Sequence, residues 1–258
     1  MRLVAAVGFL TVILGGAAHA GAAACWFENG AVVVPAAFGD IAGDFILDAS
    51  APASQLHLTR AQADGLAGPD ARADLTVAGE RLRDITLQVV DLDARSRSFA
   101  TVINGVIGAD VLAHFVVEVR FSPCRLTLYS QPPTPWGGAV RLKVARAGGV
   151  PAVVATAFDG KLSREGLFAI DTASAPVRIA EASLSRSPPA GVDPDGRDVA
   201  PARLRALSLG GRLFENIPAG LIADAPAGLA GAIGDAVWSR FDMRLDLSRG
   251  WLELVPRP

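Results

Sequence analysis

Two stretches of the chain repeat one pattern, and they limit the possible folds more than any other feature. Residues 43–52 read GDFILDASAP and residues 166–176 read GLFAIDTASAP. Each stretch has a glycine, an apolar run typical of a buried strand, a single aspartate (Asp48 or Asp171), then small residues and a proline. An ionised carboxylate is costly to bury without partners, so an acid at this place needs a reason. One such acid commonly caps a turn, whereas two in matched contexts indicate a shared role.

The likeness continues along both halves of the chain in the same order, as an internal duplication requires. A β-rich run precedes each aspartate, and an alternating pair of strands joined by a glycine turn follows it. The halves then end in GVIGADVLAHFVVEVRFSPCRLTLY (residues 105–129) and GAIGDAVWSRFDMRLDLSRGWLELV (residues 231–255). The interval from Asp48 to Gly108 is 60 positions, and that from Asp171 to Gly234 is 63. A duplication explains this agreement better than two unrelated β domains.

The duplication predicts a mainly β protein with two similar lobes and few short helices. We expect a signal peptide at residues 1–20, lobe 1 at residues 21–130, a linker at residues 131–138 and lobe 2 at residues 139–258. The linker contains PPTPWGG, which is rich in proline and glycine. The chain has 258 residues and is 51% hydrophobic, so each lobe can bury a core.

The first residues are typical of an export signal. Arg2 precedes an apolar run, and Ala18, His19 and Ala20 form a small-residue cleavage site. The alternative is an uncleaved N-terminal anchor. We therefore expect a periplasmic or secreted protein with no transmembrane span once the signal is removed.

The chain has two cysteines, Cys25 and Cys124. An even number of cysteines in an exported chain favours one disulfide, here closing a long loop. Two alternatives stay open, namely free buried thiols and lipidation of Cys25.

Several classes of function lack support in the sequence. The formal net charge is -2, which gives no electrostatic reason to expect a nucleic-acid partner. His57 and His114 have no cysteine or carboxylate cluster near them in the sequence, so we expect no metal site and no cofactor. The chain has no G-x-S-x-G nucleophile motif and no phosphate-binding loop. A duplicated chain can supply both halves of a site, so a monomer is expected.

The paired aspartates are the remaining chemistry. If a pseudo-twofold axis relates the lobes, Asp48 and Asp171 can meet where the lobes join. Two carboxylates held that close share a proton, because both do not ionise easily. One can then act as a general base on water while its protonated partner polarises a carbonyl group.

The chain resembles the retropepsin-like aspartic proteases, doubled within one chain as in pepsin-like enzymes. In that family an apolar strand ends in Asp-Thr/Ser-Gly, and a later apolar-apolar-Gly motif opens a short helix. The matching motifs here are Asp48-Ala49-Ser50 and Asp171-Thr172-Ala173, then Val106-Ile107-Gly108 and Ala232-Ile233-Gly234. The resemblance covers nearly the whole chain after residue 20. It implies the bilobed acid-protease fold, no cofactor, a polypeptide substrate, and Asp48 and Asp171 as the catalytic pair.

The chain also departs from the family pattern at the residues that would support the pair. The family's Thr or Ser makes hydrogen bonds between the two halves, which Thr172 can do and Ala49 cannot. Where the family has glycine, Ser50 and Ala173 keep the N–H but add a side chain. The alternative function is therefore a catalytically impaired relative that binds peptides or a protein partner between the lobes. A third reading is a structural domain whose aspartates only cap turns.

The resemblance also predicts a flap, the loop that closes over substrate in this family. By position it falls near residues 65–74 in lobe 1 and near residues 187–202 in lobe 2.

Overall fold

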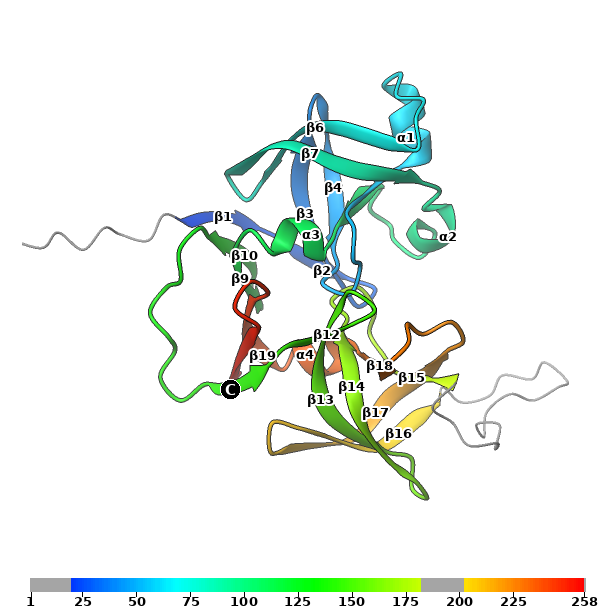
Figure 1. The fold of residues 1–258 in the computed structure, drawn as a ribbon, viewed down its shortest axis with the longest axis vertical. Helices are drawn as coiled ribbons and strands as arrows, with labels where there is room; N and C mark the ends of the chain where they lie inside the picture. Colours follow the sequence, from blue (N-terminus) through cyan, green and yellow to red (C-terminus); the bar gives the residue numbers. More distant parts are fainter. Residues whose placement is uncertain (1–19, 182–201, 258) are drawn as a thin grey trace, which may run out of the picture.

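The structure is a computed structural model that describes residues 20–181 and 202–257. The predicted signal peptide, apart from Ala20, and the predicted second flap, apart from Ala202, lie outside the described residues. Figure 1 shows two lobes, one above the other, with the strands β1, β9, β10 and β19 beside the place where they meet. Short strands make up most of the fold, as the sequence predicts.

Lobe 1 is built around a seven-stranded sheet that closes on itself. Its strand order is β2-β3-β4-β8-β5-β7-β6, and β3 also pairs with β6, which closes the ring. The strands are β2 (Trp26–Glu28), β3 (Ala31–Phe38), β4 (Ile41–Leu47), β5 (Gln55–His57), β6 (Asp70–Val77), β7 (Glu80–Val90) and β8 (Ile103–Ile107). Because β4 and β8 run parallel, the aspartate loop after β4 lies beside the Ile-Gly motif after β8.

Lobe 2 repeats this topology strand for strand. Its order is β12-β13-β14-β18-β15-β17-β16, with β13 pairing β16 to close the ring. The strands are β12 (Ala145–Ala147), β13 (Val150–Phe158), β14 (Ser163–Ile170), β15 (Val177–Ala180), β16 (Arg203–Leu209), β17 (Arg212–Ile222) and β18 (Leu229–Ile233). The identical order confirms the two similar barrel-like lobes predicted from the duplication.

A third sheet joins the lobes. Its order is β1-β10-β9-β19-β20-β11, so each lobe supplies three strands and the central pair is β9 with β19. The strands are β1 (Ala20–Ala24), β9 (Val116–Phe121), β10 (Cys124–Tyr129), β11 (Val140–Lys143), β19 (Phe241–Asp246) and β20 (Trp251–Pro256). In the central pair Glu118 lies opposite Arg244. These two residues hold corresponding positions in the two repeats, so the pseudo-twofold axis passes through this pair.

The helices of the described chain are short and lie between strands. They are α1 (Leu58–Ala63), α2 (Asp93–Ser96), α3 (Ala109–Leu112) and α4 (Asp235–Trp238). α3 and α4 follow Gly108 and Gly234, as the family resemblance predicts. α2 lies in the connection between β7 and β8, and the corresponding connection of lobe 2 has no helix.

Alternating apolar residues on the strands build one large core that runs through both lobes and the joining sheet. Phe38, Phe45, Phe168 and Trp238 are among its largest fully buried side chains. Each buried aromatic side chain of this size contributes on the order of 2 to 3 kcal/mol of hydrophobic stabilisation.

Two covalent or polar ties fix the ends of lobe 1. A disulfide joins Cys25 to Cys124, which confirms the predicted pairing. The proline-rich segment predicted as a linker is also held, because the guanidinium of Arg244 bonds the Thr134 carbonyl at 2.9 Å and lies 3.9 Å from the Trp136 ring centroid.

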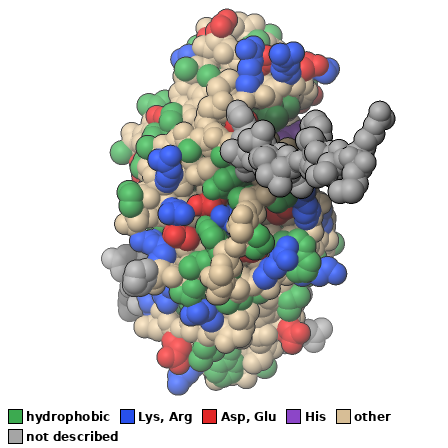
Figure 2. All heavy atoms as spheres, turned by 90° about the vertical axis from the view of Figure 1, so that its left-hand side faces the viewer, with side chains coloured by type: hydrophobic (Ala, Val, Ile, Leu, Met, Phe, Trp, Pro, Cys, Tyr) green, Lys and Arg blue, Asp and Glu red, His purple; other side chains and the backbone are tan. Residues whose placement is uncertain are grey.

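On the face shown in Figure 2, basic, acidic and apolar side chains are interspersed rather than gathered by sign. Among the described residues, none of the helices has the length and apolar character that crossing a membrane requires.

In lobe 1 the region predicted as a flap consists of a loop and the start of a hairpin. Residues 65–69 form a loop after α1, and residues 70–74 belong to β6 in the closed sheet. β6 is the first arm of a hairpin with β7, and its last residues also pair with β3. The element of lobe 1 that reaches the aspartate is α2, as the site geometry shows.

Candidate active site

The two aspartates occupy the same place in their lobes. Each follows a strand, β4 or β14, that pairs in parallel with the strand carrying the Ile-Gly motif. The backbone N–H of Asp48 donates to the Ile107 carbonyl at 2.9 Å, and that of Asp171 donates to the Ile233 carbonyl at 3.1 Å. The backbone of each acid is thus fixed by the strand that leads into α3 or α4.

Gly108 and Gly234 permit this close packing. A β-carbon on Gly108 would lie 2.8 Å from the Ala51 carbonyl oxygen, and one on Gly234 would lie 2.4 Å from the Ser174 carbonyl oxygen. Both glycines have extended backbone angles that any residue adopts. Their requirement for glycine is therefore the close approach of the aspartate loop, not a special φ angle.

Thr172 joins the two loops across the lobes. Its buried hydroxyl accepts from the backbone N–H of Ala49 at 3.0 Å and donates to the Leu47 carbonyl at 2.7 Å. The backbone carbonyl of Thr172 also accepts from the Val32 N–H at 3.3 Å. Ala49 has no hydroxyl, so the reciprocal side-chain bonds are missing. The connection between the loops is therefore made from one side only.

Asp48 is almost fully buried, with 4% of the residue exposed. Its Oδ1 atom accepts from the Ser50 N–H at 2.8 Å, the Ser50 hydroxyl at 2.6 Å and the Ala51 N–H at 3.2 Å. Its Oδ2 atom is 2.5 Å from the Nη2 atom of Arg95, which α2 carries. Every oxygen of this carboxylate therefore has a strong partner, and its charge is balanced.

Asp171 is equally enclosed, at 1% exposure. Its Oδ1 atom accepts from the Ala173 N–H at 2.9 Å. Its Oδ2 atom lies 2.5 Å from the Ser174 hydroxyl and 2.5 Å from the Nη2 atom of Arg178, a residue of β15. The two aspartates thus share one arrangement, in which backbone N–H groups hold Oδ1 and an arginine holds Oδ2.

A third carboxyl group, Asp235, lies nearby at the start of α4. It is completely buried, and neither carboxyl oxygen has a hydrogen-bond partner among the described residues. Burial raises the pKa of Asp235 well above its ordinary value, and the negative charges of Asp171 and Asp48 raise it further. Because the charges of both Asp171 and Asp48 act on Asp235, the three carboxyl groups form one electrostatic cluster.

Sequence reasoning missed four residues of this cluster: Arg95, Arg178, Ser174 and Asp235. Asp235 directly follows the second Ile-Gly motif, where the first repeat has Ala109, so comparing the repeats could have found it. Ser174 lies close enough to Asp171 to be considered. No local pattern indicates Arg95, which is 47 positions from Asp48.

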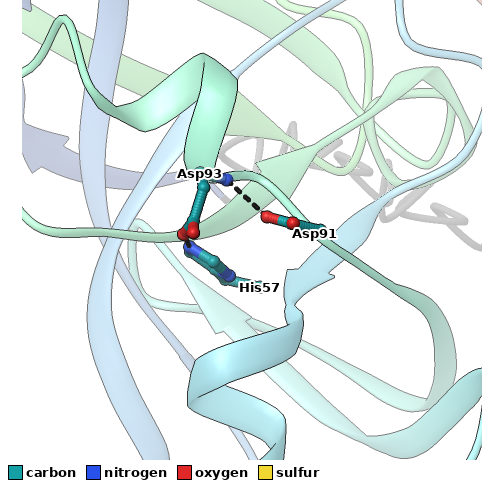
Figure 3. A group of neighbouring side chains, drawn as sticks. All are labelled: His57, Asp91 and Asp93. Atoms are coloured by element: carbon teal, nitrogen blue, oxygen red, sulfur yellow. Dashed lines mark hydrogen bonds and ion pairs between the residues drawn. The ribbon is translucent and has the colours of Figure 1, made fainter.

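His57 has acidic neighbours in the fold that no local sequence pattern indicated. Its Nε2 atom is 3.1 Å from Asp93, and Asp91 accepts the Asp93 N–H at 2.8 Å, as Figure 3 shows. The Nδ1 atom accepts from the Thr59 N–H at 3.4 Å, which leaves the proton on Nε2 to be donated to Asp93. Because both ring nitrogens have protein partners, we assign the group a structural role: it anchors α2.

A hollow elsewhere on the molecule is unrelated to this cluster. Its lining includes Thr156, Phe158 and Leu213 from the strands β13 and β17 of lobe 2, and neither aspartate contributes to it. The aspartates themselves are covered by the side chains around them.

No family model and no curated protein sequence matches the chain. Among solved structures, the chain is similar to an aspartic proteinase from Irpex lacteus, with a TM-score of 0.58 and 12% sequence identity. The match covers 92% of this chain and 97% of that protein. At this identity the likeness concerns the fold, and it confirms the bilobed aspartic-protease architecture.

Proposed function

We propose that this chain, which has the fold of an aspartic proteinase, is an aspartic-type endopeptidase with Asp48 and Asp171 as its catalytic pair. The observation that supports this most is the junction of the two matched aspartate loops through Thr172. A turn-capping role alone would not require two such loops to meet across a pseudo-twofold axis. The halves would then be retropepsin-like repeats that a single polypeptide supplies, so we also propose a monomer.

The surroundings of the acids fit the chemistry of peptide hydrolysis. In each carboxylate the Oδ1 atom is fixed by backbone N–H donors, which leaves Oδ2 as the atom that can exchange partners. With the arginines displaced, one ionised carboxylate takes a proton from the attacking water. The other, protonated, donates a hydrogen bond to the carbonyl oxygen of the scissile bond. The resulting tetrahedral intermediate then collapses as the amine nitrogen receives a proton.

An exported location is part of the proposal. The disulfide between Cys25 and Cys124 supports it, because such bonds persist in oxidising compartments. The predicted signal peptide would direct the chain to the periplasm or out of the cell. A polypeptide is the proposed substrate, and we propose no cofactor.

Cleavage of an unfolded protein across acidic to neutral pH tests the function. We expect cleavage by the chain lacking residues 1–20, and a loss of at least about a thousandfold in both Asp48→Asn and Asp171→Asn. A matched control is Asp74→Asn, which changes an acid paired with Arg81 on the outer strands β6 and β7. Cleavage that persists in either aspartate variant would contradict the assignment of Asp48 and Asp171 as the catalytic pair.

A second function is favoured by a specific observation, the complete pairing of both buried carboxylates with arginine. A chain that never releases these ion pairs would be a binding protein for peptides or for a protein partner. No cleavage by the folded chain, together with saturable peptide binding, would support this function over hydrolysis.

A further inference from the structure

The carboxylates of the aspartate pair are covered, and arginine is what covers them. The side chains of Asp48 and Asp171 are 6% and 2% exposed, whereas their partners Arg95 and Arg178 are 31% and 34% exposed. Solvent therefore meets the guanidinium groups and hardly reaches the acids. We call Arg95 and Arg178 the arginine cap.

The duplication does not account for the arginine cap. Arg178 lies on β15 opposite Ala232 of β18, and the corresponding residue of lobe 1, opposite Val106 of β8, is Gln55. Arg95 comes instead from α2, a helix that lobe 2 does not have between β17 and β18. Each lobe thus supplies a guanidinium group to the Oδ2 atom of its own aspartate, but from a different element of the fold. Both acids therefore have the same kind of partner, although it reaches them from different parts of the chain.

Both arginines are carried by anchored backbone, so opening the cap is a side-chain movement. α2 is held by the contact of Asp93 with His57, two residues before Arg95 (Figure 3). Arg178 is held within the sheet between β17 and β18. Long, partly exposed arginine side chains can swing while their backbone stays in place.

The closed cap is incompatible with the proposed reaction. Each carboxylate bonds an arginine of its own through Oδ2, so that atom is not available to an attacking water or to a scissile carbonyl group. An attacking water would have to bind where the guanidinium groups now contact the Oδ2 atoms. Hydrolysis therefore requires at least one arginine to leave its aspartate.

A carboxylate on the substrate is the group best suited to draw an arginine away from its aspartate. Arginine binds carboxylates through paired N–H donors, so an incoming acid replaces the lost ion pair, whereas a neutral side chain leaves it uncompensated. We propose that the arginine cap selects peptides with an acidic side chain next to the scissile bond, whose carboxylate takes over a guanidinium as the cap opens. This inference rests on the proposed function and names the substrate class of the same site.

A matched pair of peptides tests the proposal. Cleavage sites are first mapped by mass spectrometry on an unfolded protein, and one cleaved sequence is synthesised with Glu or Gln beside the scissile bond. We expect kcat/KM to be at least about tenfold higher for the Glu peptide, mainly through a lower KM. Arg178→Met and Arg95→Met should bring the Glu/Gln ratio close to one, because they remove the carboxylate-binding group.

Two further variants keep the result interpretable. If Arg95→Met unfolds, Arg95→Lys can replace it, because lysine keeps the positive charge. We expect this variant to have an intermediate Glu/Gln ratio of kcat/KM. Arg72→Met removes an exposed arginine paired with Asp84 and should leave the ratio unchanged. Equal cleavage of both peptides by the unaltered chain would overturn the inference while leaving the peptidase function standing.

The binding form of the experiment separates the two proposals. If neither peptide is cleaved, the endopeptidase function fails, and fluorescence anisotropy of the two labelled peptides then decides on the cap. Tighter binding of the Glu peptide by about tenfold or more, lost in Arg178→Met, supports selection by the cap. Equal affinities overturn it.

Discussion

Lobe 1 and lobe 2 share one strand order, yet they surround their aspartates with different side chains. The backbone ties of Asp48 and Asp171 to the Ile107 and Ile233 carbonyls are the same in both. The hydroxyl group that bonds the aspartate loop of the other lobe comes from Thr172 alone, because Ala49 has none. The duplication thus preserved the backbone frame that positions the acids, while the side chains around them became complementary rather than identical.

The joining sheet shows the same complementarity at its centre. Glu118 of β9 and Arg244 of β19 hold corresponding positions and pair with each other at 2.8 Å. Two identical charged residues there would repel each other. Opposite charges across the axis are possible only because the two halves belong to one chain and changed independently.

The largest expected effect on stability comes from the disulfide, which only lobe 1 contains. Replacing Cys25 and Cys124 by alanine opens a loop of 99 positions and should lower the free energy of unfolding by about 4 to 5 kcal/mol. Urea unfolding with and without a reductant measures this loss. Amide hydrogen exchange should accelerate more in lobe 1 than in lobe 2. Equal acceleration in both lobes would contradict a stabilising effect of the disulfide on lobe 1 alone.

The buried pair on the axis comes next. Arg244→Met should lower the free energy of unfolding by about 3 kcal/mol, because it leaves the buried Glu118 with fewer partners and releases the linker contact at Thr134. Chemical denaturation measures the change, with the exposed Arg72→Met as control, expected within about 1 kcal/mol. Exchanging the charges, as Glu118→Arg with Arg244→Glu, should recover part of the loss. No recovery would refute the importance of complementary charge at this position.

The one-sided connection between the aspartate loops predicts a smaller effect. Thr172→Val leaves the Ala49 N–H and the Leu47 carbonyl without their partner, which should cost about 1 to 3 kcal/mol. Ala49→Thr supplies the missing hydroxyl and should raise turnover if the one-sided connection limits catalysis. Thermal unfolding and steady-state cleavage are the measurements. An unchanged turnover in a folded Ala49→Thr protein would remove this explanation.

The smallest effect concerns Asp235, whose counterpart in lobe 1 is Ala109. Burial raises the folded-state pKa of Asp235, so the folded protein holds a proton that the unfolded chain has already released. This group therefore lowers stability as pH rises through the unfolded pKa, and the loss levels off above the folded pKa. Asp235→Ala should be more stable than the unaltered chain near neutral pH and equal to it in strong acid. Unfolding midpoints across pH test this, and parallel curves would contradict it.

Much of this protein could be predicted from local patterns. The apolar strands that end in Asp48 and Asp171, the Ile-Gly motifs and the order of signals predicted two similar β lobes, and the fold confirms them. The disulfide followed from two cysteines in a chain predicted to be exported. The catalytic role of the aspartates stays a prediction that the proposed cleavage experiments test.

The sequence by itself determined the backbone frame, because strands and turns follow from periodicity and turn residues within short windows. Only the tertiary structure decided what meets the aspartates. Arg95 reaches Asp48 because the chain between β7 and β8 folds back over the site, and Arg178 reaches Asp171 from β15. Such contacts depend on long-range packing of side chains. No pattern in a short window of sequence determines them.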